Sequence, residues 1–149
     1  MPEPERPRTD ANGLVQASIG AAALLALTGV AAVALPETFA IPHAVLSGVL
    51  FIAGVVAYLW AYLLGISRSR TEAVTLSGLF FLSGRAAPPV VSRRLRLATL
   101  AQAVIVVAAA MSRPYTEVAY GILAPMFGMG SMALWGGRHG SFPDRAPRS

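Results

Sequence analysis

The chain has 149 residues, of which 55% are hydrophobic and 13% are charged, and it carries a net charge of +5 without a single cysteine. A soluble domain carries about 25% charged residues, so this composition leaves too little polar surface for a water-soluble particle. The lack of cysteine excludes disulfides, thiolate metal sites and cysteine nucleophiles. The length is sufficient for one domain.

The first 35 residues divide into a polar tail and an apolar run. Residues 1–12 are rich in proline and charge and have almost nothing to bury, so we expect a disordered cytoplasmic tail. Residues 14–35 are apolar and would form a helix of about 33 Å, enough to cross a hydrocarbon core of about 30 Å. A cleaved signal peptide is the alternative, but its apolar region usually has about 7–15 residues, which favours a membrane anchor.

The second span is predicted at 44–66, after a short loop at 36–43. Tyrosine is its only ionisable residue type, and its aromatic residues crowd the last third, where an interfacial belt belongs. Membrane helices associate by close backbone approach at small residues, so a stripe of small residues predicts a packing surface, within the bundle or for another protein. An alanine-rich composition is the competing explanation. The stripe consists of Ala53, Ala57, Ala61 and Gly65.

The longest connection, residues 67–94, is predicted to hold a short helix that does not cross the membrane. Ser69 and Glu72 have the spacing of a capping box, which predicts a helix start near Arg70. Residues 73–82 are apolar, but ten residues give only about 15 Å of helix. We therefore expect a cytoplasmic helix at about 70–83 that either lies in the membrane interface or packs under the bundle.

The third and fourth spans are predicted at 95–111 and 115–135. Pro125 lies in the middle of the fourth span and cannot donate a hydrogen bond to the carbonyl of Gly121, so we expect a kink there. Two glycines at 136–137 should end that helix, and 138–149 reads as a polar cytoplasmic tail. The predicted fold class is thus all-α, a four-helix transmembrane bundle over residues 13–137.

The arginines orient this bundle. Two lie in the N-terminal tail, six between spans two and three, three in the C-terminal tail, and Arg113 alone lies on the other side. The positive-inside rule therefore predicts that both termini are cytoplasmic. This placement explains the basic charge by topology and attraction to lipid, without nucleic acid as a partner. All twelve basic residues are arginine, and alanine, glycine and valine are abundant, a codon bias typical of high-GC bacteria; we expect the bacterial plasma (inner) membrane.

Few side chains are candidates for chemistry. Gln102 is the one strongly polar residue near mid-membrane, and an interhelical hydrogen bond is its expected role. Glu117 should complement the dipole of helix four and pair with Arg113, with proton or cation binding as the alternative. The densest basic cluster is explained by topology, and contact with an anionic lipid or lipid-linked phosphate is its functional alternative. This cluster consists of Arg93, Arg94 and Arg96.

The sequence predicts no catalytic residue, cofactor or metal site. His43 and His139 fall on opposite sides of the predicted membrane, so they cannot share a metal, and no nucleotide-binding motif is present. The segment APMFGMGSMALWGGRHGSFPD at 124–144 resembles the C-terminus of small four-helix membrane proteins of high-GC bacteria, a resemblance that implies no activity.

The leading functional hypothesis is a non-enzymatic accessory or scaffold subunit of a membrane complex. Its partners would be the lipid bilayer and either other membrane proteins or further copies of this chain. It rests on the small-residue stripe of the second span and on the lack of buried charge. The alternative is a small transporter, flippase or channel that acts as an oligomer.

Overall fold

A computed structural model describes residues 9–145 of the chain, and its elements are helices. In chain order these are α1 (Thr9–Ala34), α2 (Pro36–Arg68), α3 (Leu76–Phe81), α4 (Pro89–Ser112), the 3-10 helix η1 (Glu117–Leu123) and α5 (Met126–His139). Four segments are long and apolar enough to cross a membrane: α1, α2, α4, and η1 together with α5. The predicted all-helical fold with four spans is therefore confirmed, and it suggests a multi-pass membrane protein.

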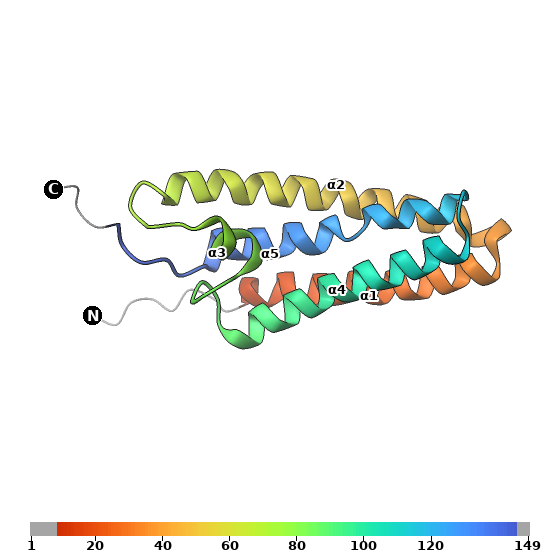
Figure 1. The fold of residues 1–149 in the computed structure, drawn as a ribbon, viewed down its shortest axis with the longest axis horizontal. Coiled ribbons are helices and arrows are strands. Elements are labelled where there is room, and N and C mark those ends of the chain that lie inside the picture. Colours follow the sequence, from red (N-terminus) through yellow and green to blue (C-terminus); the bar gives the residue numbers. More distant parts are fainter. Residues whose placement is uncertain (1–8, 146–149) are drawn as a thin grey trace.

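The four spans run side by side along one long axis, and the described chain begins and ends at the same end of the bundle (Figure 1). The fourth span packs along α2, and α1 packs along α4. We call the end that holds both described chain ends the arginine-rich end, because Arg113 is the one described arginine at the opposite end. The other described arginines are Arg68, Arg70, Arg85, Arg93, Arg94, Arg96, Arg138 and Arg145.

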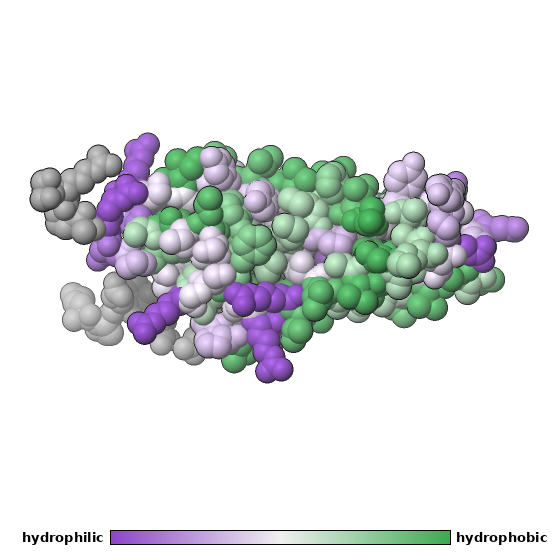
Figure 2. Space-filling model, viewed as in Figure 1, coloured by the Kyte–Doolittle hydropathy of each residue, from purple (hydrophilic) through white to green (hydrophobic). Residues whose placement is uncertain are grey.

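The surface between the two ends is apolar. Figure 2 shows hydrophobic side chains along the visible face and the strongly hydrophilic ones toward the two ends. Leu27 and Val30 of α1 are 70% and 72% exposed, and Ile52 of α2 is 64% exposed. Monomeric soluble proteins rarely expose apolar patches of this extent, whereas lipid solvates them at no cost.

The connection between the first two spans differs from the prediction. We expected a loop at 36–43, but α2 begins at Pro36, directly after Leu35. Proline suits the first helical position because its missing N–H would have no partner there. Pro42 lies inside the helix and removes one hydrogen bond near its start. The second span is therefore a helix of 33 residues rather than the predicted 44–66.

Other element ends also differ. The helix α1 begins at Thr9, inside the predicted tail, and residues 1–8 of that tail lie outside the described residues. The helix α4 begins at Pro89, six residues before the predicted third span. The predicted stop at the two glycines is also wrong, since α5 continues to His139.

Part of the tail predicted at 138–149 is held against the rest of the chain, up to residue 145. The backbone N–H of Ala73 donates to the carbonyl of Pro143 at 2.8 Å, and that of Arg145 donates to Thr71 at 3.0 Å. Phe142 packs beside the short helix α3, which gives this segment an apolar anchor. Residues 146–149 of the predicted tail lie outside the described residues.

The short helix α3 begins later than predicted. Its N-cap is Thr75, whose hydroxyl accepts from the N–H of Gly78 at 3.2 Å. Ser69 is the C-cap residue of α2 instead, and Glu72 forms an ion pair with Arg68 at 2.7 Å, so the predicted capping box is absent from these positions. Phe80 stacks on Tyr58 with ring centroids 4.5 Å apart. The helix α3 packs against α5.

Candidate functional site

The predicted packing stripe on α2 is half correct. Ala61 and Gly65 are buried, but Ala53 is exposed and Ala57 is only partly covered. The residue that faces the fourth span is Gly54, where an added Cβ would collide with the backbone at Met126. Spacing in fours drifts around a helix of 3.6 residues per turn, so a stripe of four residues, three such steps long, leaves the contact face at one end.

The expected role of Gln102 is confirmed. Its side chain is fully buried, and Nε2 donates to the backbone carbonyl of Ser18 at 3.0 Å, which joins α4 to α1. The hydroxyl of Ser18 lies 3.4 Å from the same nitrogen. Within residues 9–145, Oε1 of Gln102 has no hydrogen-bond partner.

The predicted pair of Glu117 with Arg113 is absent from the part of the chain that the structure describes. The Arg113 guanidinium instead donates to the carbonyl of Val33 at 2.9 Å, near the C-terminal end of α1. Carbonyl groups at a helix C-terminus lack partners inside the helix and attract cations, which explains this preference. Glu117 is exposed in the first turn of η1.

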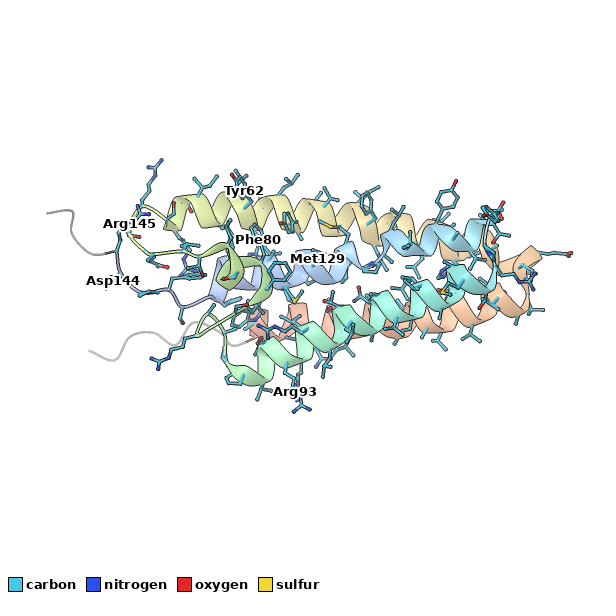
Figure 3. The ribbon with its side chains drawn as sticks, viewed as in Figure 1. Tyr62, Phe80, Arg93, Met129, Asp144 and Arg145 are labelled. Carbon is cyan, nitrogen blue, oxygen red and sulfur yellow. The ribbon has the colours of Figure 1, made fainter. Side chains whose placement is uncertain are left out.

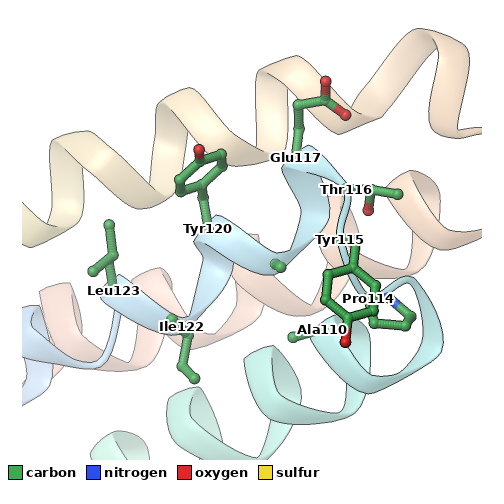
Figure 4. A pocket seen from close by; sticks show the side chains of 9 residues that line it. Ala110, Pro114, Tyr115, Thr116, Glu117, Tyr120, Ile122 and Leu123 are labelled. Atoms are coloured by element: carbon green, nitrogen blue, oxygen red, sulfur yellow. The ribbon is translucent and has the colours of Figure 1, made fainter.

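A groove of about 890 Å³ lies beside η1 at the opposite end of the bundle. Figure 4 shows Glu117 and Tyr120 on one side of η1, and Tyr115 and Ala110 on the other. A 3-10 helix has three residues per turn, so residues three apart share an edge. The carboxylate of Glu117 therefore lies in line with Tyr120 and turns away from Tyr115, and the groove does not assemble an acid–base pair.

The fourth span is interrupted at Pro125, where we expected a kink. The chain changes from a 3-10 helix to an α-helix there, and the N–H of Ala124 donates to the carbonyl of Gly121 at 2.9 Å. Pro125 cannot supply the α-helical bond to that carbonyl, which favours the tighter turn. Val118, Gly121 and Ala124 form the buried edge of η1 at the spacing of three that this helix type requires.

One buried ionisable residue, His43, lies where the sequence predicted a loop. His43 lies inside α2 and is fully buried. Its Nδ1 lies 2.9 Å from the hydroxyl oxygen of Thr28 in α1. That hydroxyl is within donor distance of the carbonyl of Leu24, at 2.8 Å, and when it donates there its oxygen can accept from Nδ1–H. We therefore infer that the imidazole carries its proton on Nδ1.

The other ring nitrogen of His43 faces η1. A Cβ added to Gly121 would lie 2.7 Å from Nε2, so the ring fills the space that this glycine leaves. Nε2 has no hydrogen-bond partner in residues 9–145. Buried ionisable residues in membrane helices usually mark function, which makes His43 the strongest candidate in the interior. The sequence feature that could have revealed its burial is a face of small and polar residues on α2. This face consists of Ala40, His43, Ser47, Gly54 and Ala61.

The three clustered arginines of α4 separate into two environments. Arg93, Arg94 and Arg96 are all exposed, but only Arg93 and Arg96 line a groove of about 460 Å³ at the arginine-rich end. Arg96 donates from Nε and Nη2 to the carbonyl of Phe81, at 3.0 and 2.8 Å, and from Nη2 to Leu82 at 2.9 Å. The guanidinium of Arg96 is therefore fixed by hydrogen bonds, although its side chain is exposed like those of Arg93 and Arg94.

Arg68 is a second structural cation that the sequence analysis did not single out. Its guanidinium donates to the carbonyls of Gly137 at 3.2 Å and Gly140 at 2.7 Å, and it lies 5.1 Å from the ring centre of Phe142. It thereby satisfies the open carbonyl groups at the end of α5.

The geometry defines a helical bundle with four candidate membrane spans, an interior with polar contacts from α1 to α2, α4 and α5, and an arginine-lined groove at one end. In the described residues, no group of three histidine, aspartate or glutamate side chains could hold a metal ion. No family model, curated protein or solved structure matches this chain.

Proposed function

We propose that this chain is a non-enzymatic accessory or scaffold subunit of a complex in the bacterial plasma membrane. The observation that carries the proposal is the outer face of α2. Within its most apolar stretch, 17% of the residues of α2 are buried by the rest of the chain, against 50% for the fourth span. The second span therefore offers most of its length to its surroundings.

The exposed face of α2 is regular as well as long. Large aliphatic side chains, 47–64% exposed, recur at alternating steps of four and three residues, which is the spacing of a seam between two packed helices. They are Val45, Val49, Ile52, Val56, Leu59, Leu63 and Ile66. A single helix of a neighbouring protein, or α2 of a second copy, fits such a seam by interlocking its own side chains.

The orientation follows from charge. Eight of the nine described arginines lie at the arginine-rich end, and the positive-inside rule favours the cytoplasm for that end. Both termini are then cytoplasmic, and α3 together with residues 140–145 covers the cytoplasmic end of the bundle. Arg113 and Glu117 lie on the outer side.

Photocrosslinking in native membranes tests this proposal. We expect a photoreactive residue at Val56 in α2 to capture one membrane protein, whereas the same residue at Val107, on the outer face of α4, captures only lipid. Both positions carry an exposed valine, 60% exposed at Val56 and 42% at Val107, on two different helices. Equal yields of crosslinked protein at the two positions would contradict the proposal that the outer face of α2 binds a partner.

A small transporter, flippase or channel is the second candidate, and His43 favours it. An imidazole with an open Nε2 lies against the interrupted span, and breaks in membrane helices often accompany transport sites. The test is proton flux into liposomes that contain the purified protein. Flux that is lost in His43→Gln and retained in Glu117→Gln would replace the scaffold proposal, and no flux above empty liposomes would reject the transporter.

A further inference from the structure

The groove at the arginine-rich end has a basic side and an apolar side. Arg93, Arg96 and Ser92 line it from α4, and Leu82 lines it from the loop after α3. None of the described residues that line it is acidic. Its charge is therefore suited to an anion, and its volume of about 460 Å³ is sufficient for a small phosphate-bearing group.

One of the two guanidinium groups is held in place before any ligand binds. Nε and Nη2 of Arg96 are engaged by the carbonyls of Phe81 and Leu82, and Nη1 takes no part in these bonds. A fixed guanidinium loses little side-chain entropy when it binds an anion, so its contribution to affinity is large for one charge.

The other guanidinium, that of Arg93, makes no ion pair within residues 9–145 and lies at the edge of the apolar surface. Figure 3 shows Arg93 projecting from α4 away from the bundle. Val90, one turn before it, is 61% exposed, and Leu97, one turn after it, is 52% exposed. The same face of α4 continues with exposed Leu100 and Val104 toward the middle of the bundle. The positive charge of Arg93 therefore lies beside a row of exposed aliphatic side chains that runs along α4.

We propose that Arg93 and Arg96 bind the phosphate of one anionic phospholipid, whose acyl chain lies along the exposed face of α4. Guanidinium N–H groups donate to phosphate oxygens, and basic pockets on the cytoplasmic side of membrane helices suit lipid headgroups. Arg93 can offer its paired donors, whereas Arg96 offers Nη1, because its Nε and Nη2 are engaged by carbonyl groups. Arg94 faces another direction on the helix and does not line the groove, so it adds only general attraction. The site does not depend on the scaffold role proposed above.

Native mass spectrometry of the purified full chain, titrated with phosphatidylglycerol or phosphatidylcholine, tests the site. We expect one phosphatidylglycerol to bind saturably and phosphatidylcholine to bind at least about tenfold more weakly. Arg93→Gln should weaken phosphatidylglycerol about tenfold, because it removes a charge-assisted contact. Arg70→Gln is the matched control, since Arg70 is exposed at the same end but does not line the groove.

Three outcomes would overturn the proposal. Equal binding of the two lipids would show that charge does not select the ligand, and equal losses in Arg93→Gln and Arg70→Gln would show diffuse attraction rather than a site. Displacement of the lipid by millimolar glycerol 3-phosphate would show a site for soluble phosphates. Arg93→Lys, which keeps the charge, should recover part of the affinity, and unchanged helicity by circular dichroism shows that each variant is folded.

Discussion

At the residue scale, two of the polar contacts between helices come from fully buried side chains of α2 and α4. Gln102 of α4 donates to Ser18 of α1, and His43 of α2 pairs with Thr28 of α1. An unpaired polar group in an apolar interior costs several kcal/mol, on the order of 2–7, so each contact fixes which faces of the helices meet. The sequence predicted the first contact because a glutamine in an apolar run is conspicuous. The contact of His43 was not predicted, because residues 36–43, which contain two prolines, were expected to form a loop.

The state of His43 is a residue-scale prediction. We expect a two-bond ¹H–¹⁵N correlation spectrum of the protein in lipid nanodiscs to place the imidazole proton on Nδ1, since the hydroxyl of Thr28 is committed to Leu24. Thr28→Val removes the acceptor and should destabilise the fold by about 1–3 kcal/mol. A proton on Nε2 in the unmodified protein would contradict the geometry.

Two glycines of α2 give a matched pair of substitutions. Gly54→Ala places a methyl group against the backbone of the fourth span, and we expect a loss of about 1–3 kcal/mol in stability. Gly48→Ala meets nothing within 4 Å, and the higher helix propensity of alanine should leave stability unchanged or raise it by up to about 1 kcal/mol. Thermal unfolding in detergent, followed by circular dichroism, measures both. Similar losses in the two variants would contradict this packing.

At the element scale, the fourth span shows where sequence reasoning succeeded and where it did not. Pro125 correctly marked an interruption, because its missing N–H is a local property of the chain. The 3-10 form of η1 was not foreseen, although Val118, Gly121 and Ala124 already show a spacing of three. The ring of His43 packs beside Gly121 of η1, a contact between residues far apart in the sequence.

The packing of η1 against α2 can be tested by a double-mutant cycle. We expect Gly121→Ala to lower stability by about 1–3 kcal/mol, because the new methyl group would lie 2.7 Å from Nε2 of His43. In a His43→Ala background, the same substitution should cost much less, with a coupling on the order of 1 kcal/mol or more. Additive effects of the two substitutions would mean that these residues do not touch.

The end of α5 gives a second element-scale prediction. Arg68→Gln removes the donor that holds the carbonyls of Gly137 and Gly140. The pairing of residues 140–145 with 71–73 should then open more often, and amide exchange at Ala73 and Arg145 should rise on the order of tenfold or more. Arg70→Gln, an exposed neutralisation two residues away, is the control. Equal exchange in both variants would show that Arg68 does not hold this segment.

At the scale of the whole molecule, the four apolar spans and the concentration of arginine at one end both fit a bundle that crosses a membrane. Hydropathy over windows longer than a helix turn predicts spans well, since it needs no knowledge of packing. It placed the span interiors correctly, but it misplaced their ends at Pro36, Pro89 and His139. Helix ends depend on caps and on neighbours from distant parts of the chain, such as Arg68 at the end of α5.

The central claim is that the bundle crosses the membrane with its arginine-rich end in the cytoplasm. The chain has no cysteine, so single cysteines can be introduced at the two ends and labelled in spheroplasts with a membrane-impermeable maleimide. Tyr115→Cys lies at the opposite end, and Ser141→Cys, a conservative change at an exposed position, lies at the arginine-rich end. We predict that Tyr115→Cys is labelled in intact spheroplasts and that Ser141→Cys is labelled only after lysis. Labelling of Ser141→Cys before lysis, with Tyr115→Cys protected, would contradict the orientation, and labelling of both would contradict the crossing itself.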